Sequence, residues 1–286
     1  MISSVRILYQ SPFNKKQPLF ALYRFFYWKL IRVFKMKRVR FSLWGNKKIY
    51  LDYDSFQCMW LMYNYIYDWE EFNLIAHFLK PGDIVGDVGS NMGIYTIWMS
   101  KFIDNGTIHS FEPDTLNYEK LKENIKVNLL EKSTRLNKLG LSNEDGTVSF
   151  TYGLDGENHI AVKNETNIVP VAVKRLDTYT DENGILFFSY LKIDVEGFEN
   201  AVLQGAEKLL KEKRIKIIQL ELNNTVINSG LKFEATIQLL QQFNYSLCGY
   251  NVTSNKLEVV EFNSLRENYF AVSDIYEANM RLNANA

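Results

Sequence analysis

Cysteine and histidine are scarce in this chain of 286 residues, and their scarcity limits its chemistry. The two cysteines, Cys58 and Cys248, lie far apart and form no Cys-x-x-Cys pair. The sequence therefore indicates neither a disulfide framework nor a zinc site, and a reducing cytoplasm is the compartment that this usage favours. The three histidines are His77, His109 and His159, so few imidazoles are available for acid–base chemistry.

Long hydrophobic runs are also missing. No charge-free apolar segment approaches the roughly 20 residues that a helix needs to cross a bilayer, and the N-terminus shows no compact signal sequence with a small-residue cleavage site. We therefore expect a cytoplasmic protein that neither crosses a membrane nor is secreted. With 47% hydrophobic residues, the chain is able to bury the core of one enlarged domain, or of a domain with an appendage.

Acidic residues are absent from the first 51 positions, which contain twelve lysines and arginines. The whole chain has 33 basic and 33 acidic residues, so the remainder carries a charge of minus twelve. Aromatic residues are interleaved with these cations between positions 19 and 41, and the spacing predicts a basic amphipathic helix with Arg24, Trp28, Arg32 and Lys35 along one stripe. Residues 1–70 are thus expected to form a basic extension of a domain over residues 71–286.

This extension has two interpretations, which the sequence leaves open. The helix packs on the next domain with its cations in water, or it lies on anionic lipid at the inner face of the membrane through residues 19–41. The extension is rich in aromatic and aliphatic residues, unlike a basic surface that binds the phosphates of a nucleic acid. Nucleic acid is therefore not an expected partner. The oligomeric state also stays open.

Strand-like and helix-like segments alternate from about Leu74 onward. Apolar runs at residues 83–89, 106–113 and 134–143 read as strands, with helical patterns between them. This rhythm predicts a mostly parallel sheet with right-handed crossovers. Residues 146–153 and 168–179 read as a strand-rich insertion, after which strands near 187–194 and 215–223 and a helix over 200–210 resume the rhythm.

The stretch DIVGDVGSNMGIYTIWMS (residues 83–100) joins a strand to a helix through a turn with two glycines. A dinucleotide needs a glycine where Asn91 stands, and Asp87 would repel its diphosphate. The same carboxylate suits the ammonium group of S-adenosylmethionine, which has no phosphate. The predicted cofactor-binding residues of this turn are Asp87, Gly89, Ser90, Asn91 and Gly93.

Glu112 follows the next strand in the motif Phe-Glu-Pro. A carboxylate at this place accepts hydrogen bonds from ribose hydroxyls, although dinucleotide enzymes use one in the same position. The alternative is an acid that begins the next helix. The order of the Asp87 motif and Glu112 favours the cofactor interpretation.

Several segments of the chain together resemble the FkbM family of S-adenosylmethionine-dependent methyltransferases. They lie in matching order between about residues 74 and 223 and are KPGDIVGDVGSNMGIYT, SFEPDTLNYEKLKENIKVN, LGLSNEDGTVSF, VKRLDTY, LKIDVEGFENAVLQGAEKLL and IIQLELN. The resemblance implies a class I, Rossmann-like methyltransferase fold: an α/β fold with a mostly parallel seven-stranded sheet. It also implies O-methylation of hydroxyls on sugars or natural products, and we predict Ser142 in the third segment as a further cofactor contact.

Methyl transfer to a hydroxyl needs a group that removes the proton as the new bond forms. His77 and His109 lie in apolar segments typical of core residues, whereas His159 lies in a loop of the insertion. Asp194 and Glu196 interrupt an apolar strand in the motif IDVEG. We predict His159, Asp194 and Glu196 as candidate catalytic residues, with helix capping as the alternative for the two acids.

A metal site is a further hypothesis. Asp194, Glu221 and Asn223 follow two predicted strands and offer the oxygen ligands that Mg²⁺ prefers. Catechol-type methyltransferases bind their metal with acids and an amide in such positions.

The sequence as a whole predicts an O-methyltransferase that acts on a sugar hydroxyl of a polysaccharide or its lipid-linked precursor, such as a cell-surface glycan. A methyltransferase for nucleic-acid bases is not expected, because the loop after the fourth strand reads DVEG and has no Pro-Pro-aromatic motif. The alternatives are an O-methyltransferase of a small natural product and an inactive glycan-binding homologue.

Overall fold

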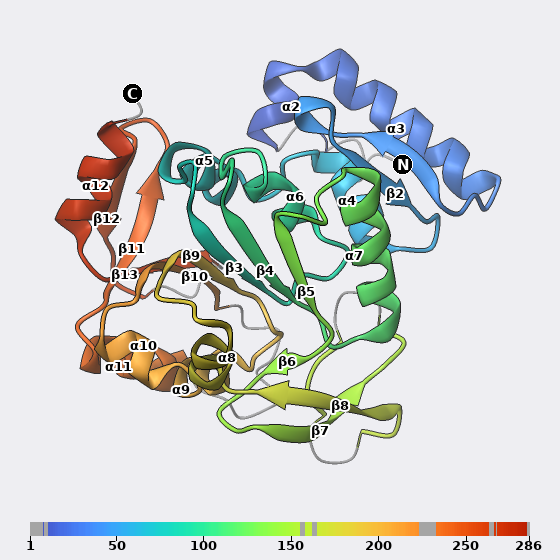
Figure 1. Cartoon of the computed structure of the whole chain (residues 1–286). Coiled ribbons are helices and arrows are strands. Elements are labelled where there is room, and N and C mark those ends of the chain that lie inside the picture. Colours follow the sequence, from blue (N-terminus) through green and yellow to red (C-terminus); the bar gives the residue numbers. More distant parts are fainter. Residues whose placement is uncertain are drawn as a thin grey trace. The chain divides into compact units, whose positions relative to one another are not determined.

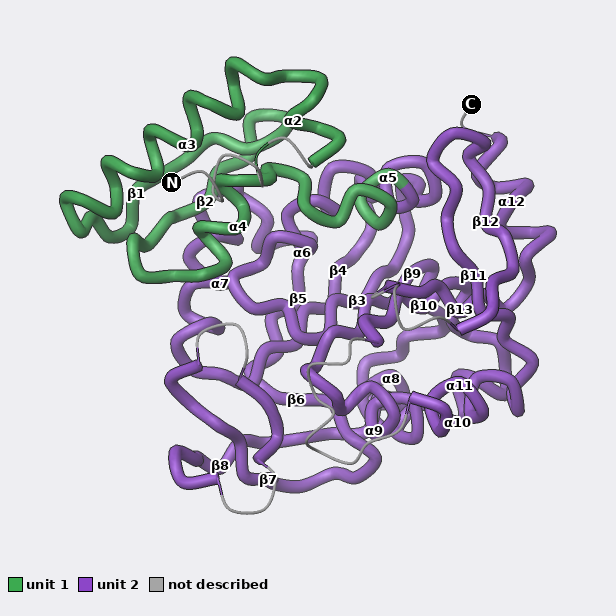
Figure 2. The backbone as a smooth tube through the Cα atoms, turned by 180° about the vertical axis from the view of Figure 1, so that it is seen from behind, with its two compact units in different colours: residues 1–73 green, residues 74–286 purple. Residues whose placement is uncertain are grey.

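The computed structural model describes residues 8, 11–154, 158–161, 165–222, 233–262, 266 and 268–284. The chain divides into two compact units, residues 1–73 and 74–286 (Figure 2). The division falls within helix α5 (Trp69–Phe78). The domain boundary that the sequence suggests, after residue 70, stays a prediction.

Unit 2 is built on an eight-stranded sheet with the strand order β12-β11-β13-β10-β9-β3-β4-β5 (Figure 1). Strands β5, β4, β3, β9 and β10 are parallel, and β13 runs antiparallel between β10 and β11. The mostly parallel α/β sheet is therefore confirmed. The strands of this sheet are β3 (Ile84–Val88), β4 (Thr107–Phe111), β5 (Thr134–Asn137), β9 (Phe188–Ile193), β10 (Ile215–Glu221), β11 (Ser246–Asn251), β12 (Lys256–Val259) and β13 (Asn268–Val272).

The chain order places the switch point of the sheet between β3 and β9. From β3 the chain moves outward to β4 and β5, and it later returns to β9 on the other side of β3 and moves outward to β10. Ligands of parallel α/β sheets bind beyond the carboxyl ends of the strands at such a point. The helices of this unit are α6 (Ile94–Met99), α7 (Thr115–Val127), α8 (Leu176–Asn183), α9 (Glu199–Gln204), α10 (Glu207–Lys211), α11 (Phe233–Gln242) and α12 (Ile275–Asn283).

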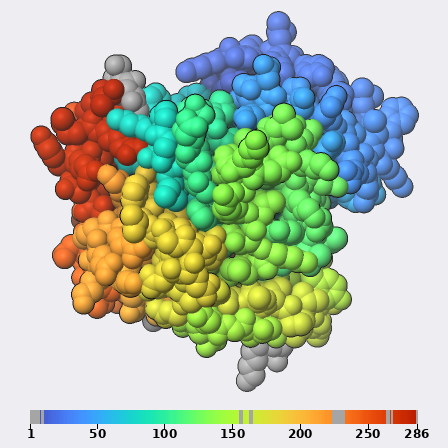
Figure 3. Space-filling model, viewed as in Figure 1, coloured from blue at the N-terminus to red at the C-terminus, as the bar shows by residue number. Residues whose placement is uncertain are grey.

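The strand-rich insertion forms a separate three-stranded sheet in the order β6-β8-β7. It comprises β6 (Gly140–Leu141), β7 (Gly146–Thr151) and β8 (Ile168–Lys174), drawn in green to yellow-green in Figures 1 and 3. Much of β8 is exposed. The buried apolar core of the unit lies instead around β9 and β10, where Leu191, Ile193 and Ile218 pack in one cluster with Leu203 and Leu209.

Several elements differ from the sequence expectations. The strand expected over 134–143 ends at Asn137, and Gly140–Leu141 belong to β6 of the separate sheet. Residues 176–179, read as strand, begin helix α8. The helix expected over 200–210 is divided into α9 and α10 at Gly205, where a Cβ would lie 2.0 Å from the Ser142 carbonyl oxygen and only glycine fits. Strand β12 is an eighth strand, where seven were expected. It was not expected because the short alternation of Leu257 and Val259 gives only a weak strand signal in the sequence.

Unit 1 contains helices and an antiparallel hairpin. Proline occupies the first turn of both α2 (Pro12–Lys16) and α3 (Pro18–Val33), where its missing N–H costs nothing. Strands β1 (Val39–Ser42) and β2 (Lys48–Leu51) pair across the short helix η1 (Trp44–Asn46), and α4 (Phe56–Asn64) follows. Within the described residues, no helix is both long and apolar enough to cross a membrane.

The orientation of α3 corrects the sequence interpretation of its cations. Arg24, expected on a solvated or lipid-facing stripe, is 0% exposed, and Trp28 is buried beside it. The Arg24 guanidinium donates to Asn14 Oδ1 at 2.5 Å and to the Met62 carbonyl oxygen at 2.8 Å. It also lies 4.8 Å from the centroid of the Tyr65 ring. Arg24 therefore links α3 to α2 and α4, and Arg32 and Lys35 are the exposed cations of the expected stripe.

Burial lowers the pKa of Arg24 to about 10, against a smaller opposing effect of Tyr65. The side chain thus keeps its charge at neutral pH. A buried guanidinium of this kind is stabilised by its hydrogen bonds and by the faces of the surrounding aromatic rings.

We expect Arg24→Ala to lower the free energy of unfolding by about 2–4 kcal/mol, because it leaves the buried Asn14 and Met62 acceptors without their donor. Arg32→Ala on the same helix is the matched control, since Arg32 is exposed, and it should change stability by less than about 0.5 kcal/mol. Urea unfolding followed by circular dichroism measures both. Equal stability of the two variants would contradict a structural role for Arg24.

Candidate functional site

The turn after β3 has a backbone that glycine and asparagine adopt readily. Gly89, Asn91 and Gly93 have φ angles of 72°, 48° and 91°, in the left-handed region. The Gly89 and Ser90 amides both donate to the Phe111 carbonyl oxygen, at 3.1 and 3.0 Å. The turn is thereby fixed at the carboxyl ends of β3 and β4, as the sequence predicts for a cofactor-binding loop.

The same turn touches the end of β9. A Cβ at Gly89 would lie 1.8 Å from the Asp194 carbonyl oxygen, so a side chain is excluded at this position. The Asp194 amide donates to the Val88 carbonyl oxygen at 3.1 Å. The cofactor turn and the predicted catalytic loop are therefore in direct backbone contact at the switch point of the sheet.

Glu112 joins the turn to the helix after β4. Its carboxylate accepts from the Asn91 amide and from the Asp114 amide, both at 2.8 Å. The side chain is 5% exposed, and desolvation raises the pKa of Glu112 to about 7, although these two hydrogen bonds oppose the shift. Each carboxylate oxygen has a second acceptor direction for a ligand hydroxyl.

Asp87 is completely buried. Its Oδ2 accepts from Thr96 Oγ1 at 2.5 Å, and its Oδ1 lies 3.8 Å from Lys192 Nζ. Among the described residues, Oδ1 has no hydrogen-bond donor. Desolvation raises the pKa of Asp87, and the charge of Lys192 acts against this rise. An acceptor of this kind fits a water or the ammonium group of a bound cofactor.

Lys192 is the central residue that the sequence reading missed. It lies on β9, directly opposite Asp87 in the register of β3 and β9, and is 3% exposed. Its Nζ donates to Asp194 Oδ2 at 2.9 Å and to the Gly89 carbonyl oxygen at 3.3 Å. Burial alone would lower the pKa of Lys192, but the charges of Asp194 and Asp87 outweigh burial and raise it above its ordinary value. One signal was available in the sequence: a lysine inside an otherwise apolar strand.

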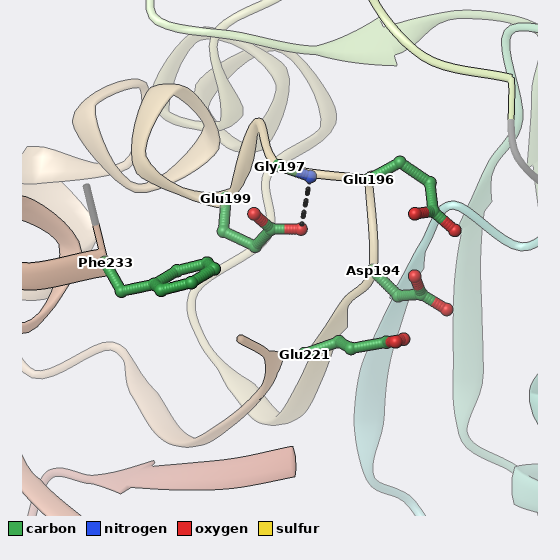
Figure 4. Close-up of a pocket in the computed structure, with 6 residues that line it drawn as sticks. All are labelled: Asp194, Glu196, Gly197, Glu199, Glu221 and Phe233. Atoms are coloured by element: carbon green, nitrogen blue, oxygen red, sulfur yellow. Dashed lines mark hydrogen bonds between the residues drawn. The ribbon is translucent and has the colours of Figure 1, made fainter. Parts of the chain in front are cut away.

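A small pocket opens beside Asp194, as Figure 4 shows. The carboxylates of Asp194, Glu196 and Glu221 point toward the same side of it. Glu196 has a φ of 52°, an uncommon value for a residue other than glycine. The residues that line the pocket are Asp194, Glu196, Gly197, Glu199, Glu221 and Phe233.

Glu199 is the second residue that sequence reasoning missed. Its Oε1 accepts from the Val195 and Gly197 amides, each at 3.2 Å, so it holds the loop that carries Asp194 and Glu196. Desolvation raises the pKa of Glu199 to about 7, and the backbone hydrogen bonds act in the opposite direction. Its position in the first turn of α9 made it resemble an ordinary acid at a helix start.

Carboxylates outnumber cations at this site. Asp87, Asp194 and Glu112 come from strand ends around the turn, Glu221 comes from the end of β10, and the buried cation among them is Lys192. Carboxyl groups accept hydrogen bonds from a cationic ligand, whereas they offer no donors to a diphosphate. These acceptors therefore fit S-adenosylmethionine, which carries a sulfonium and an ammonium group.

Of the predicted site residues, Asp194, Glu196 and Glu221 line this pocket. His159 and Ser142 belong neither to the pocket nor to the turn after β3. His159 belongs to the insertion, where its Nε2 lies 3.0 Å from Glu165 Oε1. Ser142 follows β6 and donates to Asn143 Oδ1 at 3.3 Å. Their roles in catalysis and cofactor binding stay predictions. His109 is buried as expected and pairs with the Tyr179 hydroxyl at 2.8 Å.

The metal hypothesis gains no support from the geometry. Asp194 and Glu221 line the same pocket, whereas Asn223 lies outside the described residues. In the part of the chain that the structure describes, no three or more histidine, cysteine, aspartate or glutamate side chains are grouped to hold a metal ion.

Comparison with known proteins agrees with this site. The family described as the methyltransferase FkbM domain matches residues 87–247, from Asp87 into β11. Methyltransferase 1 of Beauveria bassiana is 29% identical over 155 residues, which cover 46% of this chain and 61% of that protein. The 31-O-demethyl-FK506 methyltransferase FkbM of Streptomyces tacrolimicus is 27% identical over 161 residues, covering 45% and 61%. The chain thus spans about three fifths of the length of these relatives.

Solved structures of methyltransferases are similar at low identity. An S-adenosylmethionine-dependent O-methyltransferase from Thermotoga maritima has a TM-score of 0.42 and 13% identity, covering 82% of this chain and 77% of that chain. The human methyltransferase 10 domain containing protein has a TM-score of 0.44 and 12% identity, covering 91% and 98%. The family match, which includes more than half of the chain and both the cofactor turn and the Asp194 loop, shows that the chain belongs to the FkbM family of S-adenosylmethionine-dependent methyltransferases.

Proposed function

We propose that this protein transfers a methyl group from S-adenosylmethionine to a hydroxyl group of a sugar, in a polysaccharide or its lipid-linked precursor. The methyl-transfer proposal rests on one observation. The glycine turn, Glu112 and the Asp194 loop are in contact at the switch point of the sheet. The family match supports the same reaction class.

The residues around the turn fit the cofactor by their donor and acceptor chemistry. Glu112 accepts from the ribose hydroxyls, and the buried Oδ1 of Asp87 accepts from the ammonium group, directly or through a water. The backbone of residues 89–93 allows close approach. S-adenosylmethionine supplies an electrophilic methyl group on a positively charged sulfur.

Asp194 is the proposed group that orients the acceptor hydroxyl and takes up its proton. Its Oδ2 accepts a hydrogen bond from Lys192 Nζ at 2.9 Å, which fixes the orientation of the carboxylate. Lys192 acts as a positioning residue, since it is buried behind Asp194 and Gly89. Glu199 fixes the loop through the Val195 and Gly197 amides.

The acceptor class has two candidates. The relative from Streptomyces tacrolimicus is named for a hydroxyl of a natural product, 31-O-demethyl-FK506, which favours a small natural product as the second candidate. The sugar acceptor is supported by the basic, aromatic N-terminal region, which suits substrates presented at a membrane. Both acceptors offer a hydroxyl, so the proposed chemistry at Asp194 is the same.

We expect Glu112→Gln to weaken S-adenosylmethionine binding about 10- to 100-fold, because charge-assisted hydrogen bonds to the ribose are lost. The amide keeps one oxygen for the Asn91 or Asp114 amide, so the fold should persist. Glu119→Gln on α7 is the matched control, as its side chain is largely exposed. Isothermal titration calorimetry measures both affinities.

The pH dependence of cofactor affinity, measured on the wild type and on Glu112→Gln, gives a second test of Glu112. With a pKa of about 7 in the free protein, Glu112 is largely protonated below that pH and is then a poorer acceptor. If the bound form prefers the carboxylate, affinity rises with pH up to about 7 and levels off above it. Glu112→Gln should remove this dependence. Unchanged affinity and an unchanged pH profile in the variant would overturn the ribose assignment.

Asp194→Asn should reduce turnover at least about 100-fold while cofactor affinity stays within about threefold, because the amide keeps the shape and loses the proton acceptor. Asp181→Asn, an exposed acid on α8, is the control. Lys192→Met should also lower turnover, since the hydrogen bond that orients Asp194 is gone. Wild-type turnover in Asp194→Asn would contradict the proposal. Activity lost in EDTA and restored by Mg²⁺ would instead make Asp194 and Glu221 metal ligands.

Mass spectrometry of cell-surface glycans, with and without the gene, tests the acceptor. We expect one methyl group to disappear from a sugar residue when the gene is deleted and to return when it is restored. Restoration with the Asp194→Asn variant is the control for catalysis. Unchanged glycans together with a methyl group lost from a small metabolite would favour the natural-product acceptor.

A further inference from the structure

The outer face of α3 is apolar and exposed. Its large side chains recur every three or four residues, which places them on one side of a helix, and their exposed fractions lie between 53 and 81%. Helix α3 lies within the blue N-terminal region of Figure 3. We define the α3 stripe as the residues Leu19, Tyr23, Phe26, Leu30 and Val33.

Packing within unit 1 does not account for this stripe. The opposite face of α3 is the one that is buried, through Ala21, Phe25, Trp28 and Ile31. An ordinary surface helix is polar on the side that faces water. A continuous exposed row of apolar side chains is typical of an interaction surface.

Cations accompany the stripe. Arg32 lies in the last turn of α3, and Lys35, Lys37, Arg38 and Arg40 follow it, all of them exposed. No acidic residue occurs in the first 51 positions. Lys37 has one acidic partner, Asp54, at 3.0 Å. Asp52 accepts from the Arg38 amide at 2.8 Å. Cations still outnumber acids around the end of the stripe, and this positive excess complements an anionic surface.

We propose that the α3 stripe docks unit 1 on an anionic lipid bilayer. The helix lies parallel to the surface, with Phe26 and Leu30 between the lipid chains and the cations at the headgroups. Tyr23 stacks on the neighbouring Tyr27 at 5.7 Å, and tyrosine suits the boundary between apolar chains and water. This inference concerns binding alone and does not depend on the methyl-transfer reaction.

Sedimentation with vesicles tests the proposal on the full chain. We expect binding to vesicles of phosphatidylcholine with phosphatidylglycerol, and little binding to vesicles of phosphatidylcholine alone. Raising the salt concentration should release much of the protein, because exposed charges are screened over about 10 Å at 0.1 M salt.

Two sets of variants separate the apolar and the charged contributions. The double variant Phe26→Ser and Leu30→Ser should weaken binding to anionic vesicles at least about tenfold. Leu116→Ser and Leu129→Ser remove two side chains of unit 2 that are more exposed than Phe26 and Leu30, and form the control. The triple variant Arg32→Gln, Lys35→Gln and Arg40→Gln should weaken binding about a hundredfold at low salt. Arg24 is left unchanged because it is part of the buried structure.

Several results would overturn the proposal. These are equal sedimentation with neutral and anionic vesicles, no sedimentation with either, and unchanged binding of the Phe26 and Leu30 variant. Sedimentation-velocity experiments on the lipid-free protein test whether a second copy of the chain covers the α3 stripe instead. A dimer that this variant abolishes, combined with no vesicle binding, would assign the stripe to a second copy of the chain.

Discussion

The buried ammonium group of Lys192 is the constraint on which the site depends. Removing an isolated charge from water costs several kcal/mol, and here the cost is offset by Asp87 on one side and Asp194 on the other. Because Asp87 and Lys192 are opposite each other in the paired strands, a slip by one residue would turn Lys192 to the other face of the sheet. The ion cluster thus fixes the register of β3 and β9 as well as the position of Asp194.

The parts of the site that could be predicted from sequence have local signals. An apolar strand with Asp87 near its end, followed by two glycines, predicts a turn at that strand end. Glu112 follows the next strand in the same way. Parallel strands bring their carboxyl ends to one edge. The structure accordingly unites Asn91 and Glu112 in one hydrogen bond, although they lie 21 positions apart. The mostly parallel sheet could be predicted for the same reason, since each strand and helix is recognisable from its own residues.

The parts that sequence reasoning missed depend on partners far along the chain. Lys192 and Glu199 owe their properties to burial and to contacts that no local pattern reveals. In α3 the difficulty is different, because both faces of the helix are apolar and periodicity alone does not decide which one packs inward. The charge of Arg24 suggested an outward position, whereas Asn14 and Tyr65 supply the partners that make burial possible.

The contact between Gly89 and the residues that follow β9 has a consequence for folding. Lys192 and Gly89 are 103 positions apart. Strands β4 and β5, helix α7 and the whole insertion lie between them in the chain. Contacts between such distant residues form slowly, because a long loop has to close first. Both halves of the site become complete only when β9 has paired with β3. A ligand that bridges them therefore stabilises the contacts of highest sequence separation in the sheet, and native chains that hold it are protected there against partial opening.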